Sequence, residues 1–389
     1  MNDKRYFLLF SLVVGVVLGT AALVSYIGDP GEAFSRNIHE KEVAAILLGG
    51  ENVCNFDDCD GRLIQKNLIQ TDTRQVNAIV LGSSRSMQIR NSSLVDPAVD
   101  RQIFLNHGVP GASLEDYIAI LDLYLERGYI PRTIIIGVDP WILNANNDQK
   151  RWRTLEEEYY DGLARINSTL IVSDQYSMDI GYYIDRYSSL IARQILFNSI
   201  NKIISGPCHA TDADEADGYI KLTDGSISYP VDIRTRTVEQ VDAEANDYAH
   251  SVPIFALGNF DQIDEESRQE FEATIQFLKS RNTTVVLFLP PYHPIVYDKI
   301  ASEAQYSTVG VSESYFREFA SAENITLVGS YDPNYLNLSS IDFYDGHHLK
   351  RDVVDSVFRA TVVERDRDAF HSTATPVPER IEEVPDLLT

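Results

Sequence analysis

The sequence predicts an α/β fold, a parallel β-sheet flanked by helices, with an N-terminal transmembrane helix. Short apolar segments rich in β-branched residues alternate with amphipathic helical segments. This alternation is typical of a parallel sheet whose strands are joined by helices that cross its faces. The beginning of the chain differs, because it holds one long, uncharged apolar run, and no second run of that length follows.

Five segments have the length and composition of buried strands: 77–82, 101–107, 132–139, 283–290 and 325–330. Amphipathic helices are expected at 113–128, 264–282 and 349–365. Sites in such sheets form beyond the carboxyl ends of the strands. The residues that directly follow each strand are therefore the candidates for function.

The N-terminal apolar run has the features of a membrane anchor. Lys4 and Arg5 precede residues 6–27, which are long enough to span a bilayer. A cleaved signal peptide would have a shorter apolar core, so an uncleaved anchor is favoured. Because the basic residues precede the span, the short N-terminus should be cytoplasmic and the rest extracytoplasmic. We expect a single-pass membrane protein whose anchor occupies residues 1–27.

The remaining chain divides into three expected parts. Residues 28–75 form a membrane-proximal segment, and residues 76–365 form the α/β domain. Within that domain, an insertion at about 145–260 interrupts the strand-helix alternation, and we interpret it as a cap over the functional edge of the sheet. Residues 366–389 are rich in Pro, Glu, Ser and Thr, which predicts a disordered tail.

Charge and cysteine content narrow the possible partners. The formal net charge is −25, which argues against nucleic acid, because phosphate binding requires basic patches. Cys54 and Cys59 are close enough in sequence to form a short disulfide in an oxidising compartment. A metal site with the neighbouring aspartates would lack histidine and a second cysteine pair. Cys208 is expected to be a buried, inert thiol, and no metal or organic cofactor is implied.

The first strand is followed by Gly82-Ser83-Ser84, which would expose a serine hydroxyl at the end of a strand. Serine at a helix start is often a simple N-cap. A nucleophilic serine needs a base, and the base needs a group that orients it. Asp345 and His348 provide such a pair just before the last helix, in an order that suits a serine, histidine and aspartate triad.

Alternatives exist within the same loops. His347 could replace His348 as the base, and Asp342 could be the orienting acid. The whole loop could also be a polar turn that caps the final helix. Residues 105–117 follow the second strand and contain two glycines, whose N–H groups could point at the same developing oxyanion.

Together these motifs resemble the SGNH/GDSL hydrolase superfamily. The shared features are G-x-S after the first strand, N-x-G-x-x-G after the second and D-x-x-H before the last helix. The GSS variant and the anchor are similar to the cell-surface branch, the alginate-type O-acetyltransferases and the D-alanine transfer protein of teichoic-acid modification. The similarity covers about 76–145 and 280–365, and it implies a three-layer sandwich fold.

The resemblance assigns a role to each matching residue. It implies that Ser84 is the nucleophile, His348 the general base and Asp345 the acid that orients it. The N–H groups of Ser84 and Gly111 would be oxyanion donors.

One position departs from the family pattern. Asp139 stands where the family has an asparagine that donates to the oxyanion, and a carboxylate cannot donate. Asn144, Asn146 or a residue of the cap could replace that donor. Alternatively, Asp139 is structural, and Arg85 is its expected partner.

One further candidate comes from the fourth predicted strand. His293 follows that strand between two prolines and is a candidate for substrate contact or for a structural role.

The sequence thus predicts a membrane-anchored, extracytoplasmic serine acyl-transfer enzyme, an O-acyltransferase or esterase. Its expected substrate is a cell-surface polysaccharide or another ester, and a membrane acyl-donor protein is an expected partner. The alternative, favoured by Asp139, is a catalytically inactive scaffold that binds glycan or recruits assembly partners.

Overall fold

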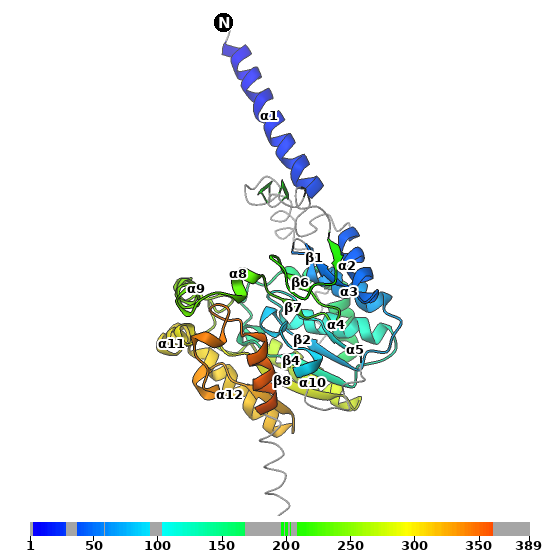
Figure 1. The fold of residues 1–389 in the computed structure, drawn as a ribbon, viewed down its shortest axis with the longest axis vertical. Helices are drawn as coiled ribbons and strands as arrows, with labels where there is room; N and C mark the ends of the chain where they lie inside the picture. The colour runs from blue at the N-terminus through cyan, green and yellow to red at the C-terminus, as the bar shows by residue number, and fades with distance from the viewer. Residues whose placement is uncertain are drawn as a thin grey trace, which may run out of the picture.

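The computed structural model describes residues 3–28, 37–57, 59–93, 103–167 and 208–360, with a few positions between 196 and 203. Figure 1 shows helix α1 (Asp3–Gly28) projecting from a globular body that holds the sheet. The tail expected at 366–389 lies outside these residues, and so does most of the insertion between 168 and 207.

The central sheet has five strands, all parallel, in the order β3-β2-β4-β8-β9. The strands are β2 (Ala78–Leu81), β3 (Phe104–Asn106), β4 (Thr133–Gly137), β8 (Thr284–Leu289) and β9 (Thr326–Gly329). Each lies inside one of the five segments predicted from the sequence. The predicted parallel α/β sheet is therefore confirmed.

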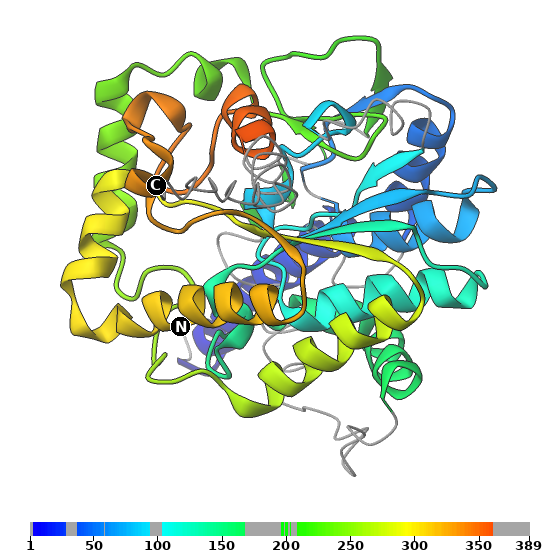
Figure 2. The ribbon, with the colours of Figure 1, turned by 90° about the horizontal axis from the view of Figure 1, so that it is seen from below.

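Side chains alternate between the two faces of the sheet, and each face has its own apolar cluster. Ile79 and Ile134 face the larger cluster, which includes side chains of α4, α10 and α12. Val80 and Ile135 face the smaller cluster, which includes the helix of residues 351–360. Figure 2 shows these helices on opposite sides of the sheet.

The helices of the body are α2 (Ile38–Leu48), α3 (Gly61–Thr71), α4 (Leu114–Glu126), α5 (Glu156–Ile166), α8 (Val231–Arg234), α9 (Val238–His250), α10 (Glu265–Ser280), α11 (Pro294–Ser302) and α12 (Ser307–Ala322). Short 3₁₀ turns are η1 (Ser84–Ser86), η2 (Asn91–Ser93), η4 (Pro140–Leu143), η5 (Arg151–Leu155), η7 (Ala304–Tyr306), η8 (Pro333–Leu336) and η9 (Ser340–Asp342). The expected helices 113–128 and 264–282 correspond to α4 and α10. Their N-termini are fixed by a capping box at Ser113 and by the Asp264 side chain, respectively.

The membrane-proximal segment packs onto the sheet domain. Ile64 and Leu68 of α3 are buried in the larger apolar cluster. At the start of α3, Arg62 makes a two-pronged ion pair with Asp116 of α4, at 2.6 and 2.7 Å, and both side chains are buried. Residues 37–71 therefore share the core of the domain that follows them.

A second, antiparallel sheet joins this segment to the insertion. Its order is β5-β1-β6-β7, with β1 (Asn52–Cys54), β5 (His209–Thr211), β6 (Ile220–Lys221) and β7 (Ile227–Ser228). Helix α5, also in the insertion, packs against α4 instead. The insertion expected at 145–260 therefore contributes both to the main core and to a separate sheet.

Helix α1 is the one candidate membrane span in the described part of the chain. Its Lys4–Gly28 portion has 25 residues and contains an 18-residue window with a mean hydropathy of 2.6, none of which is buried in the protein. It is long and apolar enough to cross a bilayer.

The disulfide that the spacing of Cys54 and Cys59 allows is not formed. All three cysteines lie in the described part of the chain, and none is in a disulfide. Cys54 directly opposes His209 in the antiparallel β1–β5 pair, and its Sγ lies 3.0 Å from the His209 Nε2. Cys59 instead lines a cavity. Cys208 is buried, and burial raises the pKa of its thiol to about 12.

Candidate active site

The loop after β2 presents Ser84 to a cavity while the residues around it are buried. Ser83 is buried, and its Oγ accepts the Arg85 N–H at 3.2 Å, so Ser83 caps η1. Ser84 starts η1 and is the one residue between Leu81 and Ile89 that is not fully buried. The N-cap role suggested by the sequence therefore belongs to Ser83, which leaves the Ser84 hydroxyl available.

Two glycines fix the position of this loop. A Cβ built on Gly82 or on Gly137 would collide with the Oγ of Ser86. Gly82 directly follows β2 and Gly137 ends β4, so Ser86 packs between the ends of two neighbouring strands. A larger residue at either position would move the turn that holds Ser84.

Ser84, His348 and Asp345 form a continuous chain of hydrogen bonds. The Nε2 of His348 lies 2.9 Å from the Oγ of Ser84, and its Nδ1 lies 2.8 Å from the Oδ2 of Asp345. The other carboxylate oxygen of Asp345 accepts the backbone N–H groups of His347 and His348, each at 2.9 Å. With Nδ1–H donated to Asp345, the Nε2 of His348 can accept the serine proton.

The electrostatics keep Asp345 ionised. Burial by itself would raise the pKa of Asp345, but His348, His347 and the hydrogen bonds from both residues outweigh it and hold that pKa well below its usual range. The carboxylate can therefore orient the His348 imidazole and stabilise it when it becomes protonated.

His347 and Asp342, the other candidates for the base and for its orienting acid, contact other residues. The ring of His347 stacks on Tyr248 with centroids 4.3 Å apart, and burial lowers its pKa well below the usual value. Asp342 accepts the Ser339 N–H at 2.8 Å and so caps η9. The geometry thus places His348 and Asp345, not His347 or Asp342, in line with Ser84.

Ser84 and His348 open onto a cavity of about 340 Å³. Gly108 and Pro110, from the loop after β3, form part of its wall. The rest comes from the β1–α3 region and from the second sheet: Phe56, Asp57, Cys59, Gly61, Ile64, Gln65, Tyr219, Lys221, Ile227 and Tyr229, together with Met87 and Asp345. The insertion and the membrane-proximal segment therefore build much of the cavity wall.

Asp139 makes a buried ion pair with Arg85. The Nη1 of Arg85 donates to Asp139 at 2.8 Å, and neither side chain is more than 2% exposed. The same guanidinium stacks 3.9 Å from the ring centroid of Tyr292 and donates to the carbonyls of Pro290 and, at 3.3 Å, His347. Burial raises the pKa of Asp139, and the Arg85 charge opposes that rise. These contacts match the alternative in which Asp139 has a structural role as the partner of Arg85.

The two backbone N–H groups expected to be oxyanion donors have no partner among the described residues. Among the described residues, no hydrogen bond uses the N–H of Ser84 or the N–H of Gly111. Gly111 has a positive φ of 57° and does not belong to the described lining of the cavity. The neighbouring N–H of Gly108 is already donated to the Asn106 side chain at 2.8 Å. The donor role expected for Gly111 stays a prediction.

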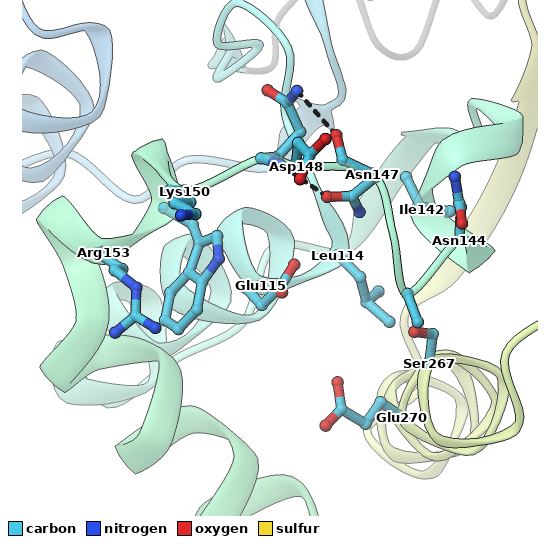
Figure 3. A pocket seen from close by; sticks show the side chains of 13 residues that line it. Leu114, Glu115, Ile142, Asn144, Asn147, Asp148, Lys150, Arg153, Ser267 and Glu270 are labelled. Carbon is cyan, nitrogen blue, oxygen red and sulfur yellow. Dashed lines mark hydrogen bonds between the residues drawn. The ribbon is translucent and has the colours of Figure 1, made fainter. Parts of the chain in front are cut away.

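Neither asparagine suggested as a replacement donor reaches Ser84. The Asn144 side chain donates to the Ala256 carbonyl at 2.9 Å, and Asn146 donates to the Asn259 carbonyl at 3.0 Å. Figure 3 shows Asn144 among the residues that line a second cavity, of about 260 Å³, whose wall also includes Glu115 and Glu270. These contacts hold the loop after β4 against residues 256–259.

Of the two roles considered for His293, the structure favours the structural one. The side chain is fully buried, and its Nδ1 accepts the Ile295 N–H at 3.2 Å, so it caps α11. Its Nε2 lies 3.4 Å from the Asp242 carboxylate of α9. Two prolines bracket this position and fix the chain so that the imidazole points inward.

Two groups of side chains in the described residues have the spacing of a metal site. One is Asp345, His347 and His348, and the other is His39, Glu42 and Cys208. In the first group, a metal would displace existing bonds, because Asp345 already accepts three N–H groups and His348 already bonds at both ring nitrogens. The first group therefore fits hydrogen bonding better than metal binding.

Sequence reasoning missed the residues that the second sheet contributes to the cavity, Tyr219, Lys221 and Tyr229. Their strands β6 and β7 have only two residues each, too short for an alternating pattern. The one available signal was Asp224-Gly225, a typical hairpin turn between them.

No protein-family model matches the chain, and no curated protein matches it significantly. The functional proposal therefore rests on the residues and their geometry.

Proposed function

We propose that this protein is a membrane-anchored, extracytoplasmic serine acyl-transfer enzyme of the SGNH type, an O-acyltransferase or esterase. The observation that supports this most is the hydrogen-bonded series Ser84–His348–Asp345 at the wall of a cavity. A serine, an imidazole and a carboxylate in this order are the elements of nucleophilic acyl transfer.

In the first half-reaction, the Oγ of Ser84 attacks the acyl carbonyl, and its proton passes to the Nε2 of His348. The tetrahedral oxyanion accepts hydrogen bonds from the unpartnered N–H of Ser84 and from that of Gly111. Its collapse breaks the ester C–O bond, and the leaving alkoxide takes the proton from His348. The product is an alcohol and an acyl group esterified to Ser84.

In the second half-reaction, His348 removes a proton from an acceptor hydroxyl, which attacks the acyl-Ser84 carbonyl. The acyl–Oγ bond breaks, and Ser84 recovers the proton from His348. Water as the acceptor gives hydrolysis, and a sugar hydroxyl gives transfer, through the same three residues. No step uses a metal or an organic cofactor.

The location and the substrate follow from features outside these three residues. The basic residues Lys4 and Arg5 at the start of α1, before its apolar run, predict that the body lies outside the cytoplasm, where a membrane acyl-donor protein would supply the acyl group. Tyr219 and Tyr229 give the cavity aromatic faces, which suit the apolar faces of sugar rings. A cell-surface polysaccharide is accordingly the proposed acceptor, and the second sheet acts as the cap over the site.

The adjacent serines give a matched test on the full-length protein in detergent. Ser84→Ala should reduce hydrolysis of 4-nitrophenyl acetate by about 10⁴-fold or more, because the nucleophile is lost. Ser83→Ala should retain most of the activity, because it removes only a cap worth about 1 kcal/mol. EDTA should leave the rate of the unmodified protein unchanged.

The reverse pattern, loss with Ser83→Ala and retention with Ser84→Ala, would move the nucleophile by one residue. Inhibition by EDTA that Zn²⁺ reverses would favour metal binding at Asp345, His347 and His348. If the folded protein neither hydrolyses nor transfers the acyl group of any ester, the inactive scaffold becomes the better interpretation.

A further inference from the structure

Lys221 is a buried cation in the wall of the Ser84 cavity. It lies in β6, opposite Val53 of β1, and is 4% exposed. Its Nζ donates one hydrogen bond, at 3.0 Å, to the carbonyl of Gly225 in the β6–β7 turn. An ammonium group has three donors, so two remain unused.

No carboxylate of the described residues forms an ion pair with Lys221. The nearest acid, Asp224, instead accepts the N–H and the hydroxyl of Ser226, at 3.0 and 2.6 Å. Burying a charge without a partner is costly, and burial lowers the pKa of Lys221 to about 8. Because no acid of the described residues pairs with it, this buried lysine in a cavity wall points to an anion that binds in the cavity.

None of the acidic groups described around the cavity neutralises Lys221, so an anion could pair with it there. Asp345 is engaged with His348 and with backbone N–H groups, and Asp57 is exposed to solvent. The neighbouring His107 lies between Gln65 and the hydroxyl of Tyr124, and burial lowers its pKa to about 3, so it is neutral. Lys221 is therefore the positive charge of the buried wall.

We propose that the cavity binds an ester whose acyl or alcohol part carries a carboxylate or phosphate, and that Lys221 Nζ pairs with that anion. This specificity rests on the proposed acyl-transfer function of Ser84. The pair would satisfy the unused donors of Lys221 and fix the ester carbonyl relative to the Ser84 hydroxyl.

The test compares esters that differ in charge, with the full-length protein in detergent. The acyl-side probes are 4-nitrophenyl acetate and mono-4-nitrophenyl succinate, and the alcohol-side probes are phenyl acetate and 4-acetoxybenzoate. A cationic probe, the 4-nitrophenyl ester of β-alanine, completes the set. We expect a higher kcat/KM for at least one anionic ester than for its neutral counterpart, and the pair that shows it identifies which part bears the anion.

Lys221→Met should lower that anionic-to-neutral ratio of kcat/KM by about 10- to 100-fold, the range for losing a charged hydrogen bond. Lys221→Arg should restore part of it. Lys150→Met, which removes a lysine from the wall of the second cavity, should leave the ratio unchanged. Equal ratios in wild type and Lys221→Met, or a preference for the cationic ester, would overturn the proposal.

A binding measurement separates this proposal from the chemistry at Ser84. In the Ser84→Ala background, calorimetry should detect binding of monomethyl succinate or methyl phosphate, and Lys221→Met should abolish it. If no ester is hydrolysed by wild type but this binding and its loss are seen, the enzyme proposal fails and the anion site stands. If neither anion binds, or if Lys221→Met binds equally well, the anion site is wrong.

Discussion

Ser84 and Arg85 are adjacent in sequence but belong to two polar clusters with opposite characters. Ser84, His348 and Asp345 face a cavity and are partly exposed, and the Ser84 N–H has no partner in the part of the chain that the structure describes. Arg85 and Asp139 are buried together, and three hydrogen bonds with a stacked tyrosine occupy the guanidinium. The cavity cluster keeps an unused hydrogen-bond donor beside the Ser84 hydroxyl, whereas each nitrogen of the buried guanidinium donates a hydrogen bond within the protein.

The difference indicates that the two clusters have separate roles, one in activity and the other in stability. Arg85 binds the carbonyls of Pro290 and His347, so the buried pair ties the loop of Ser84 to the loop after β8 and to the loop of His348. It therefore connects the loop of Ser84 to the loop of His348 from inside the protein. Changes in the cavity cluster should alter activity with little effect on stability, and changes in the buried pair should do the reverse.

The largest expected effect is the loss of esterase activity when one of the two histidines of the cavity loop, His348, is changed. His348→Gln should lower the esterase rate by about 10⁴-fold or more, because the base that accepts the Ser84 proton is lost. His347→Gln should cost far less, because its ring stacks on Tyr248 and does not bond Ser84. Steady-state kinetics of the two variants provide the measurement. A larger loss with His347→Gln would assign the base to that residue and remove the distinction between the two rings.

Asp139→Asn tests the buried pair. The change leaves the Arg85 charge buried without its counter-charge, which should lower the free energy of unfolding by about 3 kcal/mol. Because Asp139 does not belong to the described cavity wall, the amide should not act as an oxyanion donor, and the rate should not rise. Chemical denaturation and esterase kinetics on the same sample measure both. A faster enzyme of unchanged stability would place Asp139 at the oxyanion.

His107 extends the comparison between cavity-facing and buried groups to the pH dependence of stability. It is buried, and both of its ring nitrogens have hydrogen-bond partners. Its pKa falls to about 3 in the folded protein, against about 6.5 in the unfolded chain. The unfolded state therefore takes up a proton below pH 6.5, and stability falls as the pH drops. Between pH 7 and pH 4.5 this group should cost about 2 kcal/mol.

His107→Asn should reduce the loss of stability between these two pH values by that amount. The comparison is between the two pH slopes, so it holds even if the variant is less stable throughout. Equal slopes in the two proteins would show that His107 is protonated in the folded state.

The sequence was sufficient for the main sheet and for the central residues of the site. All five parallel strands are apolar segments, and a parallel sheet buried on both faces requires that composition. The order of Ser84, Asp345 and His348 along the chain was enough to propose a triad, because strand ends meet at one edge of the sheet. The structure places the His348 ring within hydrogen-bonding distance of both Ser84 and Asp345.

What the sequence could not show depends on contacts between distant segments. Cys54 faces His209 rather than Cys59 because β1 pairs with β5, about 150 residues away. The inward direction of His293 depends on α9, which supplies Asp242. Lys221 lies in a two-residue strand, whose register is set by β1 and not by its own composition.

The most direct test of the central claim is labelling with a fluorophosphonate, which reacts with activated serines. The full-length protein should form one covalent adduct, and peptide mass spectrometry should locate it on Ser84. Asp139→Asn should still label, more weakly if the loop loosens, whereas His348→Gln should not, because Ser84 then lacks its base. A folded wild-type protein that does not label, or an adduct on a residue other than Ser84, would contradict the account.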